Sequence, residues 1–180
     1  MFYKILETIS NERISISINL SVEDMNNKDI VKMIINALSS FEYNRLITFE
    51  ILETEALNNY GDVQLFIDSV RSYGAKVAID DFGSGYSNFA HILNMQVDYI
   101  KIDASLISNV DTDKNSRLMV ETIVKLAKQL GIETVAEFVS TEEIYLTVKE
   151  LGVDWGQGYW LGKPVSLDEM KAKIENVPSK

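Results

Sequence analysis

Two adjacent carboxylates, Asp80 and Asp81, are the residues of this chain best suited to chemistry. They follow a short apolar run, residues 76–79, and precede a glycine-containing turn at residues 82–86. Neighbouring carboxylates repel each other unless a cation lies beside them, and at the end of a strand a divalent metal or a basic side chain commonly supplies that charge. The competing interpretation is an aspartate-rich turn that ends a strand and caps the next helix.

The same arrangement recurs along the chain, because short apolar runs repeatedly lead into a polar residue and then into a segment of helical length. The runs cover residues 14–18, 46–49, 76–79, 99–102, 134–136 and 153–155. The polar residues that follow them are Asn19, Glu50, Asp80 with Asp81, Asp103, Glu137 and Gln157. Six strands separated by helices predict parallel βαβ units. In such folds the carboxyl ends of the strands share one face, where ligands bind.

Helical spacing of apolar residues predicts the elements that position these strands. The predicted helices cover residues 2–9, 27–38, 63–70, 113–130, a segment that starts at Thr141, and 167–174. In the longest of them we expect the inner face to contain Leu118, Ile123, Ala127 and Leu130. Gly131 is expected to end that helix as its C-terminal cap.

Four of the strand-end residues, Asn19, Glu50, Asp80 and Asp81, offer only oxygen donors. Oxygen-rich sites without thiolates suit Mg²⁺ or Mn²⁺ better than zinc or copper. Four such donors on neighbouring strand ends could hold two ions, which is the arrangement used for in-line attack on a phosphodiester.

Two further residues, Lys101 and Glu137, allow two interpretations each, and Gln157 is a third candidate. Lys101 lies between isoleucines in an apolar run, so it is either a desolvated lysine that needs an anionic partner or an edge-strand lysine that faces water. Glu137 has the same ambiguity. Gln157 lies between Gly156 and Gly158, where the backbone can approach a ligand closely.

Composition fits one α/β domain that covers residues 1–180. Of the 180 residues 46% are hydrophobic, enough for one sizeable core. The formal net charge is −10 and no basic cluster is present, which argues against general nucleic-acid binding. The chain contains no cysteine and no apolar run of membrane-spanning length, and a cytoplasmic location is the simplest expectation.

Six motifs, in this order, resemble those of the EAL-type phosphodiesterases of bacterial cyclic di-GMP signalling. They are SINLS at residues 17–21, FEILE at 49–53, AIDDFGSGYSNF at 78–89, DYIKID at 98–103, GIETVAEFV at 131–139 and GQGYWLGKP at 156–164. The resemblance covers nearly the whole chain. It implies a TIM-type (β/α) barrel that opens cyclic di-GMP to linear pGpG with the help of Mg²⁺ or Mn²⁺.

The resemblance also implies a role for each matching residue. Lys101 corresponds to a lysine that positions or activates the attacking water, and Glu137 to a further acidic residue of the site. Gln157 corresponds to a glutamine at the substrate, and Glu53 to a glutamate that holds the Asp-Asp-Phe-Gly loop. The metal ligands implied by the resemblance are Asn19, Glu50, Asp80 and Asp81.

Two departures from the family pattern shape the expected activity. The strand with the Glu-Ala-Leu motif has no counterpart here, so we expect an N-terminally incomplete barrel of about six of the eight strands, with low or absent turnover. In the fifth motif Phe138 and Ser140 stand where glycine and glutamate are usual. The alternative is therefore a non-catalytic module that binds cyclic di-GMP or a protein partner. An open barrel exposes strand edges, which predicts a homodimer or higher oligomer.

Overall fold

The computed structural model describes residues 2–84 and 95–175, so residues 85–89 of the AIDDFGSGYSNF motif lie outside it, whereas Asp80 to Gly83 lie within it. The described residues form one parallel sheet with the strand order β1-β2-β3-β4-β5-β6. The strands are β1 (Ile16–Asn19), β2 (Ile47–Leu52), β3 (Lys76–Phe82), β4 (Tyr99–Ile102), β5 (Glu133–Ala136) and β6 (Trp155–Gly156). The expected six parallel strands are thus confirmed, each beside its neighbour in sequence.

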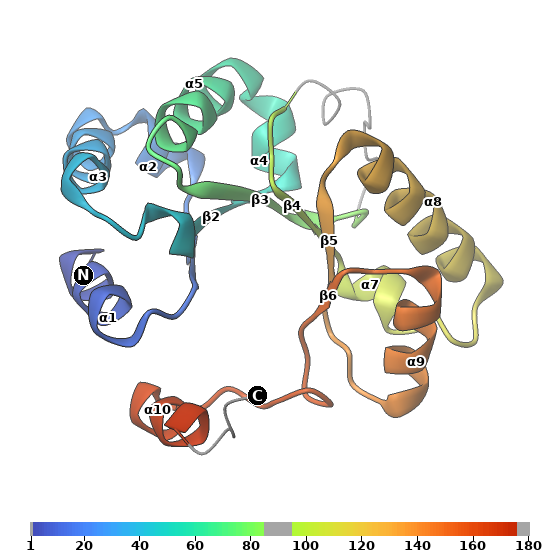
Figure 1. Cartoon of the computed structure of the whole chain (residues 1–180). Coiled ribbons are helices and arrows are strands. Elements are labelled where there is room, and N and C mark those ends of the chain that lie inside the picture. Colours follow the sequence, from blue (N-terminus) through green and yellow to red (C-terminus); the bar gives the residue numbers. More distant parts are fainter. Residues whose placement is uncertain (1, 85–94, 176–180) are drawn as a thin grey trace.

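Helices surround this curled sheet on its outer side (Figure 1). Those before β3 are α1 (Phe2–Glu12), α2 (Val22–Asn26), α3 (Lys28–Ser40), α4 (Glu53–Asn58) and α5 (Tyr60–Arg71), with a 3₁₀ turn at Asn44–Leu46. Those after β4 are α7 (Ala104–Ile107), α8 (Lys114–Leu130) and α9 (Glu142–Leu151), whereas α10 (Leu167–Glu175) lies apart from the sheet, across its open side (Figure 1). No helix within the described ranges is long and apolar enough to cross a membrane. The fold is a curled, open (β/α) barrel.

Local sequence signals explain where the longer helices begin and end. The Asp113 side chain accepts a hydrogen bond from the Ser116 N–H at the start of α8, and Gly131 ends that helix with a left-handed φ of 70°. Thr141 caps α9 in the same way through the Ile144 N–H. These boundaries match the sequence-based expectations.

The expected inner face of α8 was wrong at one position. Leu118 is 61% exposed, and the buried residues of the helix are Val120, Ile123, Val124 and Ala127. Leu118 is nine residues before Ala127, and nine steps of 100° place it on the opposite side of the helix. The pattern of apolar residues does not predict α2, α4 and α7, which are too short to show a helical period.

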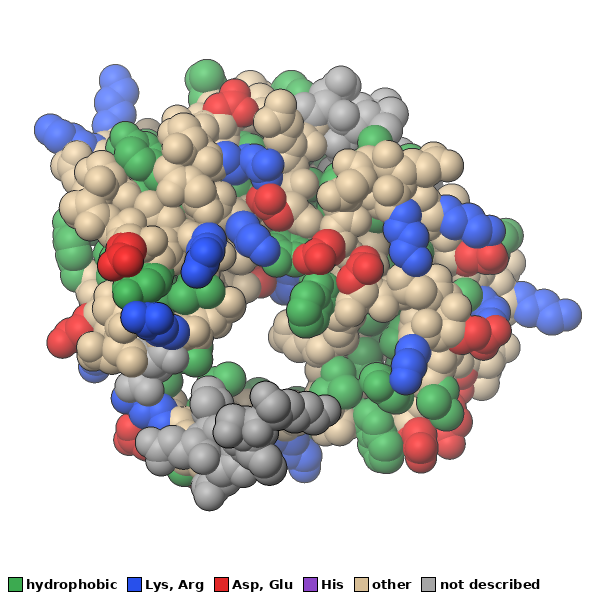
Figure 2. Space-filling view, in the orientation of Figure 1, with side chains coloured by type: hydrophobic (Ala, Val, Ile, Leu, Met, Phe, Trp, Pro, Cys, Tyr) green, Lys and Arg blue, Asp and Glu red, His purple; other side chains and the backbone are tan. Residues whose placement is uncertain are grey.

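The strands β1 to β4 each have one largely apolar and one largely polar side, and this alternation positions the site. In β2 the side chains of Ile47, Phe49 and Ile51 are fully buried, whereas Thr48 and Glu50 line a central cavity of about 290 Å³. The space-filling view shows the molecule hollowed at its centre (Figure 2). The apolar sides therefore pack under the helices, and the polar sides face the interior of the barrel.

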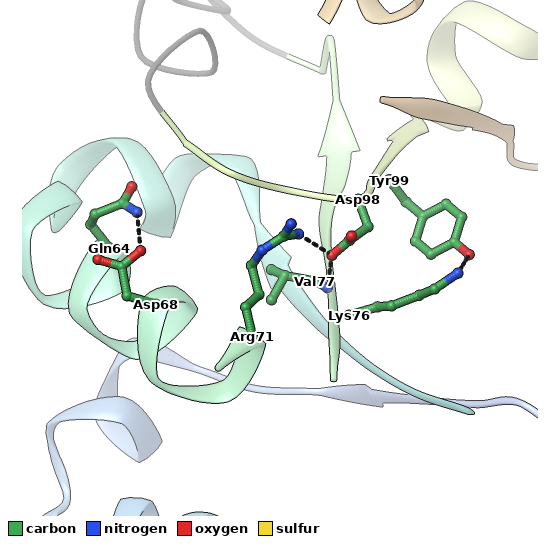
Figure 3. Close-up of polar contacts among 7 residues, drawn as sticks. All are labelled: Gln64, Asp68, Arg71, Lys76, Val77, Asp98 and Tyr99. Carbon is green, nitrogen blue, oxygen red and sulfur yellow. Dashed lines mark hydrogen bonds and ion pairs between the residues drawn. The ribbon is translucent and has the colours of Figure 1, made fainter. Parts of the chain in front are cut away.

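Aspartates just before two strands fasten the sheet at the ends where the strands begin. Asp98 accepts a hydrogen bond from the Val77 N–H of β3 and pairs with Arg71 of α5 (Figure 3). Lys76 beside it donates to the Tyr99 hydroxyl. Asp154, just before β6, binds the start of β5 as Asp98 binds the start of β3. Its Oδ2 accepts hydrogen bonds from both the N–H and the Oγ1 hydroxyl of Thr134 at 2.8 Å. These bonds fix the register of the strands.

The Asp154 contact predicts the stability of a matched pair of variants. Thr134 is fully buried and its Oγ1 also accepts the Asp154 N–H at 3.2 Å. Thr134→Val keeps the shape of the side chain but removes the hydroxyl partner of the Asp154 carboxylate and of the Asp154 N–H. The free energy of unfolding, measured in urea, should therefore fall by about 1–3 kcal/mol. Thr48→Val, in the cavity wall, should change stability by less than about 0.5 kcal/mol. Equal losses in both variants would contradict this role of Asp154.

Candidate functional site

The polar residues at the carboxyl ends of the strands gather around Lys101. This lysine is only 6% exposed in the middle of the sheet. Its Nζ lies 2.7 Å from Asp80 Oδ1 of β3, 3.0 Å from Glu50 Oε2 of β2 and 3.0 Å from Glu137 Oε1 after β5. Of the two interpretations left open by the sequence, the geometry supports the desolvated lysine with anionic partners.

The surroundings of Lys101 keep it charged. Burial by itself lowers the pKa of an ammonium group, but the hydrogen bonds to Asp80, Glu50 and Glu137 outweigh it and raise the pKa of Lys101 well above its usual range. At neutral pH this side chain is a cation without a lone pair, so it cannot accept a proton. What it can do is donate hydrogen bonds and hold its three carboxylate partners in place.

A bulge in β3 brings the second aspartate to the same site. Ile79 pairs with Ile100 and Phe82 pairs with Ile102, so two residues of β3 stand opposite the single residue Lys101. Asp81 absorbs the extra residue with a left-handed φ of 55°, a region that aspartate tolerates better than most residues. Strict alternation would have pointed Asp81 away from Asp80, toward the helices.

Asp80, Asp81 and Glu137 form a carboxylate cluster, with one oxygen from each lying within 4.8 Å of the others. Desolvation, followed by the charge of Asp80, raises the pKa of Asp81. Desolvation is also the main reason for the raised pKa of Glu137, although Lys101 opposes it. Crowded carboxylates with raised pKa values fit a divalent cation, because binding one would remove their repulsion.

The other candidate ligands lie next to this cluster. Asn19 stands beside Glu50 in the β1–β2 register, and it has the same strand parity as Ser17, which lines the central cavity. Glu50 is held by Lys101 and is not among the three clustered carboxylates. The family resemblance implies a catalytic role for Glu137 and a metal-ligand role for Glu50, and in the structure it is Glu137 that lies with Asp80 and Asp81.

The backbone of Gln157, which lines the cavity, is bound both to the last residue of β5 and to the segment that follows β5. Its N–H donates to Ala136 O at 2.8 Å, and its carbonyl accepts from the Val139 N–H at 3.0 Å. A Cβ at Gly158 would lie 2.3 Å from the Val139 backbone, so only glycine fits beside Gln157. From the sequence we expected the glycines here to let the backbone approach a ligand. In the structure Gly158 instead lets the Val139 backbone approach.

Glu53 fixes the loop that follows the aspartates. It is 3% exposed, and its Oε2 accepts the Gly83 N–H at 2.9 Å. Phe138, directly after Glu137, is 57% exposed and has a left-handed φ of 57°. A bulky residue is rarely found in that conformation, which explains why glycine is usual at this position of the motif.

Several residues of the cavity wall were not predicted from the sequence. Lys76, Tyr99, Arg45 and Trp155 line it together with Glu50, Lys101 and Gln157. The alternation of the strands could have predicted Lys76 and Tyr99. Each precedes an inward-facing site residue of its own strand by an even number of positions, and residues so separated lie on the same side of a strand.

Comparison with known proteins places this geometry in a family. The EAL domain model matches residues 2–164. The chain belongs to the EAL domain family. It is 34% identical over 153 residues to cyclic di-GMP phosphodiesterase PdeB of Shewanella oneidensis and 37% identical over 131 residues to cyclic di-GMP phosphodiesterase PdeF of Escherichia coli. These alignments cover 84% and 73% of this chain but only 18% of each relative.

Solved EAL structures share the fold. An EAL domain protein of Listeria monocytogenes has a TM-score of 0.85 and 28% identity, covering 97% of this chain and 71% of the other. Klebsiella pneumoniae BlrP1, in a manganese and cyclic di-GMP complex, has a TM-score of 0.77 and 28% identity, covering 85% of this chain and 40% of the other. The expected family and barrel type are thereby confirmed.

Replacing Lys101 tests the electrostatics of this EAL site. Lys101→Met leaves Glu50, Asp80 and Glu137 buried without a cation, so we expect a loss of about 3 kcal/mol near neutral pH. Glu137, whose pKa is already raised by desolvation, would lose the opposing effect of Lys101, so its folded-state pKa would lie further above its unfolded value. Such groups stabilise the fold at low pH and lose that contribution as pH rises, so the deficit should be larger at about pH 8 than at about pH 5.

The control is Lys125→Met, whose ammonium is 70% exposed and pairs with Glu121 one turn earlier. Urea denaturation at both pH values should show no measurable change for it. A Lys101 deficit that does not depend on pH would contradict the charge argument.

Proposed function

We propose that this EAL domain chain acts in the metal-dependent hydrolysis of cyclic di-GMP to linear pGpG. The observation that carries the proposal is the buried Lys101 ammonium in contact with three carboxylates, beside the cluster of Asp80, Asp81 and Glu137. The names of the relatives PdeB and PdeF support this substrate. The BlrP1 complex supports a site where a metal and cyclic di-GMP are bound together.

Asp80, Asp81, Glu50 and Asn19 are the proposed ligands for Mg²⁺ or Mn²⁺, and the position of Glu137 adds it to this set. All five residues are hard oxygen donors. The four carboxylates carry more negative charge than the neighbouring Lys101 can neutralise, which favours a cation. When bound there, a divalent cation supplies polarisation of the phosphoryl group and acidification of a water molecule.

The chain's own side chains supply orientation. Lys101, which stays protonated, donates hydrogen bonds that fix Glu50, Asp80 and Glu137 relative to one another. Gln157, which lines the same cavity as Glu50, is proposed to contact the substrate through its amide. Glu53 keeps the loop after Asp81 in place through Gly83.

Calorimetric titration with Mn²⁺ tests the proposed metal site. Asp80→Asn should weaken Mn²⁺ binding at least about tenfold, because it removes a charge from a hard-cation site. Asp68→Asn, on the exposed side of α5, is the matched control and should bind like wild type. Equal affinities for wild type and Asp80→Asn would contradict the assignment.

Incubation of wild type and Lys101→Ala with cyclic di-GMP and Mn²⁺ separates hydrolysis from mere binding. Slow, Mn²⁺-dependent formation of pGpG that is lost in Lys101→Ala would support the enzyme. Binding of cyclic di-GMP without any product would instead favour the alternative of a non-catalytic module.

A homodimer or higher oligomer is proposed from the open side of the barrel. Large apolar side chains after the start of β6 are exposed, with Trp155 at 58%, Tyr159 at 66%, Trp160 at 49% and Leu161 at 48%. The other candidate surface is α8, where Leu118 is 61% and Met119 is 40% exposed. Exposed apolar patches next to strand edges are typical of interfaces.

Light scattering over a concentration series tests this. Wild type should become dimeric or larger as concentration rises, and Trp160→Ser should shift the equilibrium toward monomer. Leu118→Ser is the comparison, and a shift confined to it would move the interface to α8. A wild-type chain that stays monomeric at the highest concentration would overturn the proposal.

A further inference from the structure

The short helix α4 connects two loops of the site, and only one of the two contacts was expected. It follows β2 directly, three residues after Glu50, and carries Glu53 and Glu55 in its first turn. Glu53 Oε2 accepts the Gly83 N–H of the loop after Asp81. Glu55 Oε2 accepts the Val22 N–H at 3.1 Å, 33 residues away, in the loop after Asn19.

The Val22 N–H is a backbone group that needs a partner from outside its own helix. Val22 is the first residue of α2, and the first four N–H groups of a helix have no acceptor within it. The capping box formed by Ser21 and Asp24 serves the N–H groups of those two residues. Glu55 therefore supplies an acceptor that α2 itself does not provide.

The contact secures the segment that carries Asn19. One step beyond Asn19 the Leu20 N–H donates to the Glu50 carbonyl at 2.9 Å, which extends the β1–β2 ladder. Two residues later Val22 is bound by Glu55. Residues 19–22 are thus attached at two points to one continuous piece of chain, the end of β2 with α4.

We propose that Glu55 is a positioning residue for Asn19. Glu53 and Glu55 bind α4 to the two loops beside Glu50. The positions of Asn19 on one side and of Asp80 with Asp81 on the other therefore depend on the same helix. The inference rests on the proposed function, since it assigns Glu55 a part in the geometry of the proposed metal site.

The first measurement needs no metal. Amide hydrogen exchange at Val22 should be faster in Glu55→Ala than in wild type and should return toward wild type in Glu55→Gln, whose amide oxygen can accept the same bond. Thr54→Ala, an exposed neighbour on α4, is the control and should leave Val22 unchanged. Unchanged Val22 exchange in Glu55→Ala would overturn the contact.

The second measurement is Mn²⁺ affinity by calorimetry. Glu55→Ala should weaken binding about tenfold, as expected when support for a ligand is lost, with Glu55→Gln and Thr54→Ala close to wild type. In an Asn19→Ala background the further change Glu55→Ala should have no added effect, because the ligand it positions is gone. A merely structural role would lower affinity equally in both backgrounds and would overturn the proposal.

The two failures can be told apart. Mn²⁺ binding that depends on Asp80 but ignores Glu55 would refute only the role of Glu55. Binding that does not depend on Asp80 would refute the proposed metal site and this role with it, even where Val22 exchange shows the contact.

Discussion

The structure depends on how an ammonium group and several carboxylates share the interior of a curled sheet. Lys101 is buried there with Glu50, Asp80 and Glu137 within 3.0 Å. Burying any one of these charges alone would be strongly unfavourable. Together they offset one another, and desolvation, with a smaller contribution from neighbouring carboxylates, still raises the pKa of Asp81 and Glu137. An interior of this kind is unfavourable for a purely structural core and favourable for binding a cation.

The alternation of the strands makes that interior possible. Apolar residues such as Phe49 and Ile79 point outward and are covered by helices, so hydrophobic burial stabilises the sheet from outside. The polar side is left free to carry chemistry. The bulge in β3 adds one deviation to this rule, and that deviation gathers Asp80 and Asp81 at the same place.

Backbone contacts then give the site its precision. Glu53 and Glu55 reach out from α4 to the loops on either side of β2, and the backbone of Gln157 is bound to the segment after Glu137. Asp98 and Asp154 fix the opposite ends of the strands. The site residues therefore lie on elements whose relative positions are set by several independent hydrogen bonds.

The sequence by itself determined the order of strands and longer helices, because period-two runs and helical stripes are local patterns that caps such as Asp113, Gly131 and Thr141 delimit. Its motifs also singled out the polar residues at the carboxyl ends of the strands, but not Glu55 of α4 and not the cavity-wall residues Lys76, Tyr99, Arg45 and Trp155. Only the tertiary structure decided that Lys101 is buried among carboxylates, that Asp81 turns inward through a bulge, and that Glu137 joins the aspartates while Glu50 is tied to the lysine. These facts depend on side chains far apart in the chain, and no local pattern encodes the distance between two strand ends.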